Sequence, residues 1–226
     1  MSTKTVVTSL ALVFGAASLA MPADASIIYD NGGPLISPTY VGVLSDFDTD
    51  RQRQRADDFQ LFSYGNTITE IQWWGVYGDG PVPAADNFTI RIFADNGGLP
   101  ESDPIIELAA GDVGRTDSGL DQDFQGGLDV YAYSYAVSPI TLDANTTYWL
   151  SIVNDTSGEA VNWFWENSSG SGNTATRASD DGGWWTVSRE MAFSLSNDSV
   201  APEPASMLLM GIGLAGLGVS RFRRKR

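Results

Sequence analysis

Three aspartates stand at alternate positions, Asp46, Asp48 and Asp50, within the stretch SDFDTDRQRQRADD. Alternate carboxylates begin the calcium-binding loop D-x-[DN]-x-[DN]-G, where they converge on one ion. Here Arg51 stands where that loop needs glycine, and Asp57 stands where it needs glutamate. Two interpretations remain open: a structural calcium ion that pins a loop through the three aspartates, or a solvated charge cluster without a metal. No other cofactor is indicated.

The residue types for most hydrolytic chemistry are missing, since the chain has no cysteine and no histidine. This excludes disulfides, thiol nucleophiles, Cys/His zinc sites and the Ser-His-Asp triad. A glycoside hydrolase would need two carboxyl groups about 5–5.5 Å or about 6.5–9.5 Å apart. Glu70 and Glu166 are the candidates, because both lie near tryptophans that could raise a carboxyl pKa. We predict that the protein is not an enzyme and keep a glycan-active hydrolase as an alternative.

Seven tryptophans offer a second kind of chemistry, because an exposed indole ring can stack on a sugar ring or a peptide. Adjacent residues of a strand face opposite sides, so one ring of each adjacent pair should point away from the core. The alternative for each ring is packing in the core or under a loop. The ligand-binding candidates are Trp163, Trp165, Trp184 and Trp185.

The elements that must position these residues alternate with a period of two, as half-buried strands do. The segments are FTIRIFA (88–94), VYAYSYAV (130–137), YWLSIV (148–153), VNWFWE (161–166) and MAFSLS (191–196). Turn sequences rich in Asp, Asn and Gly separate them. No long segment keeps helical spacing outside the two chain ends. The pattern predicts an all-β, antiparallel, jelly-roll-like β-sandwich of about nine to eleven strands.

The N-terminus has the layout of a secretory signal peptide. One lysine precedes an apolar stretch from about residue 6 to residue 21, and Ala23 and Ala25 supply the small side chains of a cleavage site. We predict cleavage after Ala25, which leaves Ser26 as the first residue. The alternative is an N-terminal membrane anchor, although the apolar stretch is short for a membrane-spanning helix, which needs about 20 residues.

The C-terminus combines an uncharged run with a basic end. Residues 205–220 carry no charge, and four arginines and a lysine lie among the six residues that follow. As a helix, this run would reach about 24 Å at about 1.5 Å per residue, short of the roughly 30 Å hydrocarbon core. The basic cluster would stay on the cytoplasmic side. The sequence therefore predicts a hydrophobic anchor helix that holds the exported chain at the membrane transiently.

Pro202, Glu203 and Pro204 precede this run, and the three parts in this order resemble the PEP-CTERM sorting signal of bacterial exported proteins. The resemblance covers about the last 26 residues; one departure is Ala201, where valine is common. It implies processing by an exosortase-type enzyme near the triplet, in a Gram-negative-type envelope and often in bacteria that make exopolysaccharide. The alternative is a simple membrane anchor with a chance Pro-Glu-Pro.

The part of the chain between its ends is strongly acidic. Residues 26–220 hold seven arginines, no lysine and 27 acids, a formal charge of −20. Such a surface repels nucleic acid, so we predict no nucleic-acid partner. We expect a signal peptide at 1–25, a β-sandwich domain at 26–196, a tether at 197–204, and a sorting anchor with basic tail at 205–226. Residues 55–195 are similar to a recurrent β-sandwich domain of surface-anchored bacterial proteins, a resemblance that implies fold and location only.

Together these features predict an exported, non-catalytic protein of the outer surface or extracellular matrix, anchored transiently in the inner membrane and cut by an exosortase. An extracellular polysaccharide is the expected partner of the sandwich. The alternative is a lectin-like carbohydrate-binding module with calcium-stabilised loops.

Overall fold

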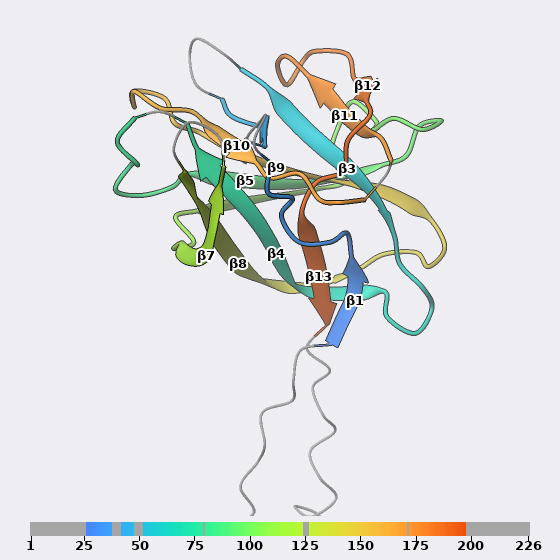
Figure 1. Cartoon of the computed structure of the whole chain (residues 1–226). Helices are drawn as coiled ribbons and strands as arrows, with labels where there is room; N and C mark the ends of the chain where they lie inside the picture. Colours follow the sequence, from blue (N-terminus) through green and yellow to red (C-terminus); the bar gives the residue numbers. More distant parts are fainter. Residues whose placement is uncertain are drawn as a thin grey trace, which may run out of the picture.

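The computed structural model describes residues 26–37, 42–47, 52–78, 80–123, 127–170 and 172–197. These residues form thirteen β-strands in two antiparallel sheets and no α-helix (Figure 1). Within these ranges, no helix is long and apolar enough to cross a membrane. The predicted all-β antiparallel fold is confirmed. The expected signal peptide and anchor helix lie outside the described residues.

The seven-stranded sheet is organised around its long strand β4 (Thr67–Tyr77). One edge of β4 pairs along most of its length with β8 (Leu128–Thr141), which pairs in turn with β7 (Thr116–Gln122). The other edge of β4 pairs with β13 (Phe193–Asn197) in its middle and with β10 (Trp163–Trp165) at its end. β13 pairs in turn with β1 (Ser26–Asp30), and β10 pairs with β2 (Val43–Leu44).

The six-stranded sheet has the order β12-β11-β3-β9-β5-β6, so strands that are distant in sequence are neighbours in space. Its strands are β3 (Gln54–Gln60), β5 (Phe88–Ala94), β6 (Ile106–Gly111), β9 (Thr147–Asn154), β11 (Thr174–Arg177) and β12 (Trp185–Val187). The two sheets together exceed the eight strands of a simple jelly roll, because short strands extend both of them.

The main hydrophobic core lies between the two sheets, as the alternating pattern predicts. Phe88 of β5 meets the ring of Trp73 on β4 edge-on, with 5.2 Å between ring centroids, and meets Trp163 at 5.1 Å. Edge-to-face packing at this separation is favourable between aromatic rings. The inward residues of all five predicted segments belong to this core or pack against it. The predicted alternation of buried and outward side chains is therefore confirmed.

Candidate functional site

The outer face of β4 carries a row of polar and aromatic side chains. Trp73 points into the core and is fully buried, whereas Trp74 points outward and is partly exposed. This confirms that one ring of an adjacent pair faces away from the core. Alternate residues share a face of a strand, so Gln72 and Glu70 lie on the same outer face as Trp74. The row lies opposite the outward residues of β8.

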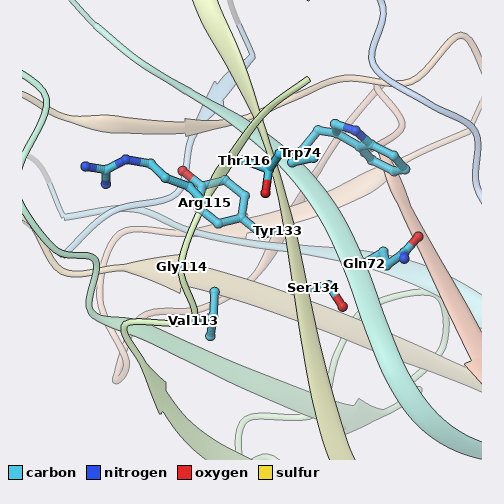
Figure 2. Close-up of a pocket in the computed structure, with 9 residues that line it drawn as sticks. Gln72, Trp74, Val113, Gly114, Arg115, Thr116, Tyr133 and Ser134 are labelled. Atoms are coloured by element: carbon cyan, nitrogen blue, oxygen red, sulfur yellow. The ribbon is translucent and has the colours of Figure 1, made fainter. Parts of the chain in front are cut away.

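A hollow of about 370 Å³ opens on this outer face beside Trp74. We call it the outer groove, and Figure 2 shows the residues that line it, on β4, on β8 and at the start of β7. They are Gln72, Trp74, Val113, Gly114, Arg115, Thr116, Ala132, Tyr133 and Ser134. Gly114 and Ala132 add little side-chain volume to the hollow, and Ala132 pairs directly with Trp74.

Hydrogen-bonding groups surround the indole of Trp74 in the outer groove. Gln72 offers an amide, and Thr116 and Ser134 offer hydroxyl groups. The Ser134 hydroxyl donates to the carboxylate of Glu70, which lies one outward position beyond Gln72 on β4. An aromatic surface with a few placed polar groups is the usual make-up of a small-ligand site.

Arg115 lines the groove, but its guanidinium group is bound to residues that do not line it. Its guanidinium donates to the carboxylate of Asp86 at 3.0 Å and to the carbonyl of Pro83. It also lies over the rings of Tyr77 and Tyr131, 5.5 Å from each centroid. Figure 2 shows the side chain extending away from Trp74. The groove therefore offers hydroxyl, amide and carboxylate groups, a combination that favours an uncharged, hydroxyl-rich ligand over an anion.

A second hollow, of about 310 Å³, lies on the outer face of the six-stranded sheet. Asp58 and Asp95 line it together with Trp149, whose indole N–H donates to Asp95 at 2.8 Å. Burial, followed by the nearby Glu190 charge, raises the pKa of Asp58. Trp149 is only 3% exposed, so this hollow presents carboxyl groups but no aromatic face.

Trp163 and Trp165 are core residues, which corrects their assignment as ligand-binding candidates. Both are fully buried, and Trp165 donates its indole N–H to the carbonyl of Ala192. They share one face of β10, as predicted, but that face is turned toward the opposite sheet. Neither ring has a surface on which a ligand could stack.

Trp184 and Trp185 lie beside the six-stranded sheet and have different surroundings. Trp184 is partly buried against Phe93, and the Arg177 guanidinium lies 4.5 Å from its ring centroid. Trp185 is 45% exposed on β12. A ligand at these two rings stays a prediction, and neither of them lines the two hollows described above.

Asp46 of the calcium hypothesis is buried and already bound by protein donors. Its carboxylate accepts from the amide and hydroxyl of Thr156 and from the amide of Trp163, at 2.6–3.1 Å. Asp48 and Asp50 lie outside the described residues. Within the described ranges, no group of three or more acidic side chains is placed to hold a metal ion. A calcium ion at the three aspartates stays a prediction.

Glu166 is fully buried beneath the N-terminal segment that precedes β2. Gln122 at the end of β7 donates to its carboxylate at 2.7 Å and to the carbonyl of Leu35 at 3.1 Å, and it accepts from the amide of Ser37. Burial raises the pKa of Glu166 to about 7, and the Gln122 hydrogen bond opposes the rise. The raised pKa was anticipated from the sequence, but the burial leaves no path for a sugar chain to reach Glu166 in this structure.

Glu70 and Glu166 are not brought together. The amide of Glu166 donates to the carbonyl of Trp74, whereas Glu70 lies four residues earlier on the same strand. Four residues of strand span about 13 Å, beyond the spacing that either glycosidase mechanism needs. The sorting triplet Pro202, Glu203 and Pro204 and the cleavage-site residues Ala23 and Ala25 lie outside the described residues.

Comparison with known protein families identifies a sorting motif at the chain's C-terminus. Residues 200–225 match the PEP-CTERM protein-sorting motif, which implies an exported protein processed by an exosortase-type enzyme in a Gram-negative-type envelope. Residues 36–210 match a second family, described as a domain of unknown function, and the chain belongs to this family, DUF7901. No curated protein and no solved structure matches the chain.

The sequence analysis missed most of the outer groove. One ring of each adjacent tryptophan pair was expected to point outward, but Trp74 was not among the ligand-binding candidates, and Gln72, Thr116 and Ser134 were not singled out. They come from three separate parts of the chain, and only strand pairing brings them together. The pairing of Gln72 with Ser134 follows from the β4–β8 register, which the alternating pattern alone does not determine.

Proposed function

We propose that the protein is an exported, non-catalytic surface or matrix protein whose β-sandwich binds an extracellular polysaccharide in the outer groove. The sorting motif at residues 200–225 supports the route of delivery. The observation that carries the binding function is Trp74, a partly exposed indole set in a hollow among amide and hydroxyl groups. Stacking on a ring face and hydrogen bonds to hydroxyl groups are the two interactions that a pyranose offers.

The charge of the groove favours an uncharged glycan over an acidic one. Glu70 supplies a carboxylate at one end of the groove, and the Arg115 charge is held by Asp86. Residues 26–220 carry a formal charge of −20, which would repel uronate or sulfate groups along a polymer. A neutral polysaccharide meets no such repulsion.

The absence of catalysis is part of the proposal. Of the two carboxylates that could have served a hydrolase, Glu166 is buried and Glu70 is bound to Ser134 on the open sheet face. The groove is a site for holding a chain, and we expect no product from polysaccharides that bind in it.

The test is affinity electrophoresis of the secreted, processed protein in gels that contain hydroxyethylcellulose, dextran or alginate. We expect retardation by at least one neutral polymer and none by the uronate polymer alginate. Trp74→Ala should weaken the affinity at least about tenfold, or about 1.4 kcal/mol, because the stacking surface is lost. Tyr64→Ala is the matched control, since it removes an exposed aromatic ring that does not line the groove.

Two results would contradict the proposed function. One is a wild-type protein that none of the polymers retards. The other is retardation that Trp74→Ala and Tyr64→Ala leave equally unchanged while circular dichroism shows both variants folded.

A further inference from the structure

The chain enters and leaves the described body at the same end. Ser26, the first residue of β1, pairs with Asn197, the last residue of β13, at the edge of the seven-stranded sheet. Figure 1 shows these two strand ends side by side at the bottom of the molecule. Whatever follows Asn197 in the sequence must therefore start from this end.

An apolar patch lies at this end, formed by Ile27, Phe62 and Tyr64, and we call it the tail-end patch. Their exposed fractions are 59%, 44% and 86%. The rings of Phe62 and Tyr64, in the turn between β3 and β4, stack with 5.7 Å between centroids and an interplanar angle of 7°. The turn packs against β1, because a Cβ built on Gly65 would lie 2.8 Å from the side chain of Ile28. The patch residues therefore lie on two elements that pack against each other, the β3–β4 turn and β1.

The segments that form the patch are uncharged in an otherwise acidic molecule. Residues 26–29 and 61–69 contain no charged side chain, although the chain has 28 acids. The neighbouring β8–β9 turn, which contacts the β3–β4 turn through the Asn145 amide and the Leu61 carbonyl, contributes one acid, Asp143. The segments that form the patch therefore add no electrostatic repulsion from an anionic surface.

The distance from the patch to the C-terminal apolar run is limited by the chain. Eight residue steps separate Asn197 from Ala205, and a fully extended chain covers about 3.5 Å per step, or about 28 Å. If the 205–220 run lies in a bilayer, Asn197, at the same end of the sandwich as the tail-end patch, is held within that distance of the bilayer surface. Aromatic rings such as Tyr are favoured at the membrane interface.

We propose that the tail-end patch contacts the lipid surface while the precursor is anchored, so that this end of the sandwich faces the bilayer. The inference goes beyond polysaccharide binding and relies only on the anchoring part of the proposed function. A lipid surface fits better than a protein partner, because Tyr64 protrudes with 86% of its surface exposed. A protruding ring inserts readily into a soft interface.

The test uses single nitroxide labels, which the cysteine-free chain accepts without background. Tyr64→Cys places a label in the patch. Trp185→Cys places a control label on β12, opposite Thr176 of β11, which pairs in turn with Arg55 near the end of β3 that is farther from the β3–β4 turn. The labelled chain, uncleaved at its C-terminus, is reconstituted into phosphatidylcholine vesicles that contain no processing enzyme, and collision with oxygen and with a water-soluble nickel chelate is measured.

On vesicle binding, we expect the label at position 64 to gain oxygen collisions and to lose nickel-chelate collisions severalfold, while the label at position 185 stays unchanged. The same label in a chain that ends at Pro204 should show neither change. A vesicle-bound chain whose label at position 64 remains as accessible to the nickel chelate as in solution would overturn the inference but leave anchoring intact.

Two other outcomes separate the inference from its premise. A full-length chain that does not bind the vesicles contradicts the anchoring on which the inference rests. Protection at position 64 that appears only in membranes containing the exosortase would assign the patch to a protein partner and overturn the lipid assignment.

Discussion

At the scale of single residues, the strand period decides which tryptophan is structural and which is available to a ligand. Trp73 and Trp74 are adjacent, yet one is fully buried between the sheets and the other borders the outer groove. Trp163 has the inward orientation of Trp73, and Gly75 makes room for it, since a Cβ at that position would lie 2.4 Å from the indole ring. The same residue type therefore has two roles on one sheet.

Replacing an inward tryptophan should change the free energy of unfolding far more than replacing an outward one. Trp163→Ala removes a fully buried ring from the core, and we expect a loss of about 3–5 kcal/mol in the free energy of unfolding. Trp74→Ala should change the free energy of unfolding by less than about 1 kcal/mol, because its ring is partly in water already. Urea unfolding followed by circular dichroism measures both. Equal losses would show that Trp74 is also a core residue.

The buried carboxyl of Glu166 makes stability depend on pH. Its pKa is about 7 in the folded protein and 4.5 for a free side chain, so the folded state holds the proton more tightly. The stabilisation from protonation is complete below about pH 4.5 and is lost as the pH rises to about 7.

We therefore expect Glu166→Gln to flatten this dependence. Relative to the variant, the wild type should lose about 3 kcal/mol of unfolding free energy between pH 4.5 and pH 8. Urea titrations across this range measure it, and Glu101→Gln at an exposed position is the control. Parallel curves for wild type and Glu166→Gln would mean that Glu166 remains solvated.

At the scale of elements, a polar network joins the two sheets at the β1, β3 and β13 strands. The side-chain Nδ2 of Asn31, just after β1, donates to the carboxylate of Asp57 on β3 at 2.8 Å and to that of Glu190 at 2.9 Å. The amide of Met191, just before β13, donates to Asp57 at 2.6 Å. Burial raises the pKa of Asp57, and the Glu190 charge raises it further. The network connects the two sheets, but it also holds the carboxyl groups of Asp57 and Glu190 close to each other.

Glu190→Gln should relieve this repulsion, because the amide oxygen can still accept from Asn31. A raised carboxyl pKa means that stability falls as the pH rises above the ordinary range of Asp. The variant should therefore gain about 1 kcal/mol over the wild type at pH 8 and nothing at pH 3. Thermal unfolding at the two pH values measures this, with Asp181→Asn as the exposed control. A gain of equal size at both pH values would refute a charge effect.

The longer strands could be predicted from the sequence because alternation is a local property. The segment FTIRIFA, for example, is β5 from end to end. The short strands β2, β11 and β12 have two to four residues, too few to show a period, and they exist because a longer neighbour pairs with them. This is why about nine to eleven strands were expected and thirteen are found.

The site was less predictable than the fold for a related reason. The outer groove combines residues 72–74, 113–116 and 132–134, and the Asn31 network joins residues that lie 26 and 159 positions apart. Contacts of this kind depend on strand order and register, which alternation does not specify. The burial of Trp163 and Trp165 was equally undetermined, since period two places both rings on one face without saying which face is inward.

At the scale of the whole molecule, the two proposed functions use different surfaces. The outer groove lies on the outer face of the seven-stranded sheet, and the tail-end patch lies elsewhere, near the paired ends of β1 and β13. Figure 1 shows these two strand ends at one end of the sheet. A body held at its end leaves the sheet face free. Anchoring and cleavage can therefore precede polysaccharide binding without any rearrangement of the sandwich.

The central claim is that a trimmed sandwich acts outside the inner membrane. The most direct test is the intact mass of the protein recovered from its native host, measured separately for each cell fraction. The account predicts a mass that corresponds to a chain from about Ser26 to the Pro-Glu-Pro region, found at the outer surface or in the medium. A mass that still includes Arg226, found in the inner membrane, would contradict it and would make the protein a permanently anchored one.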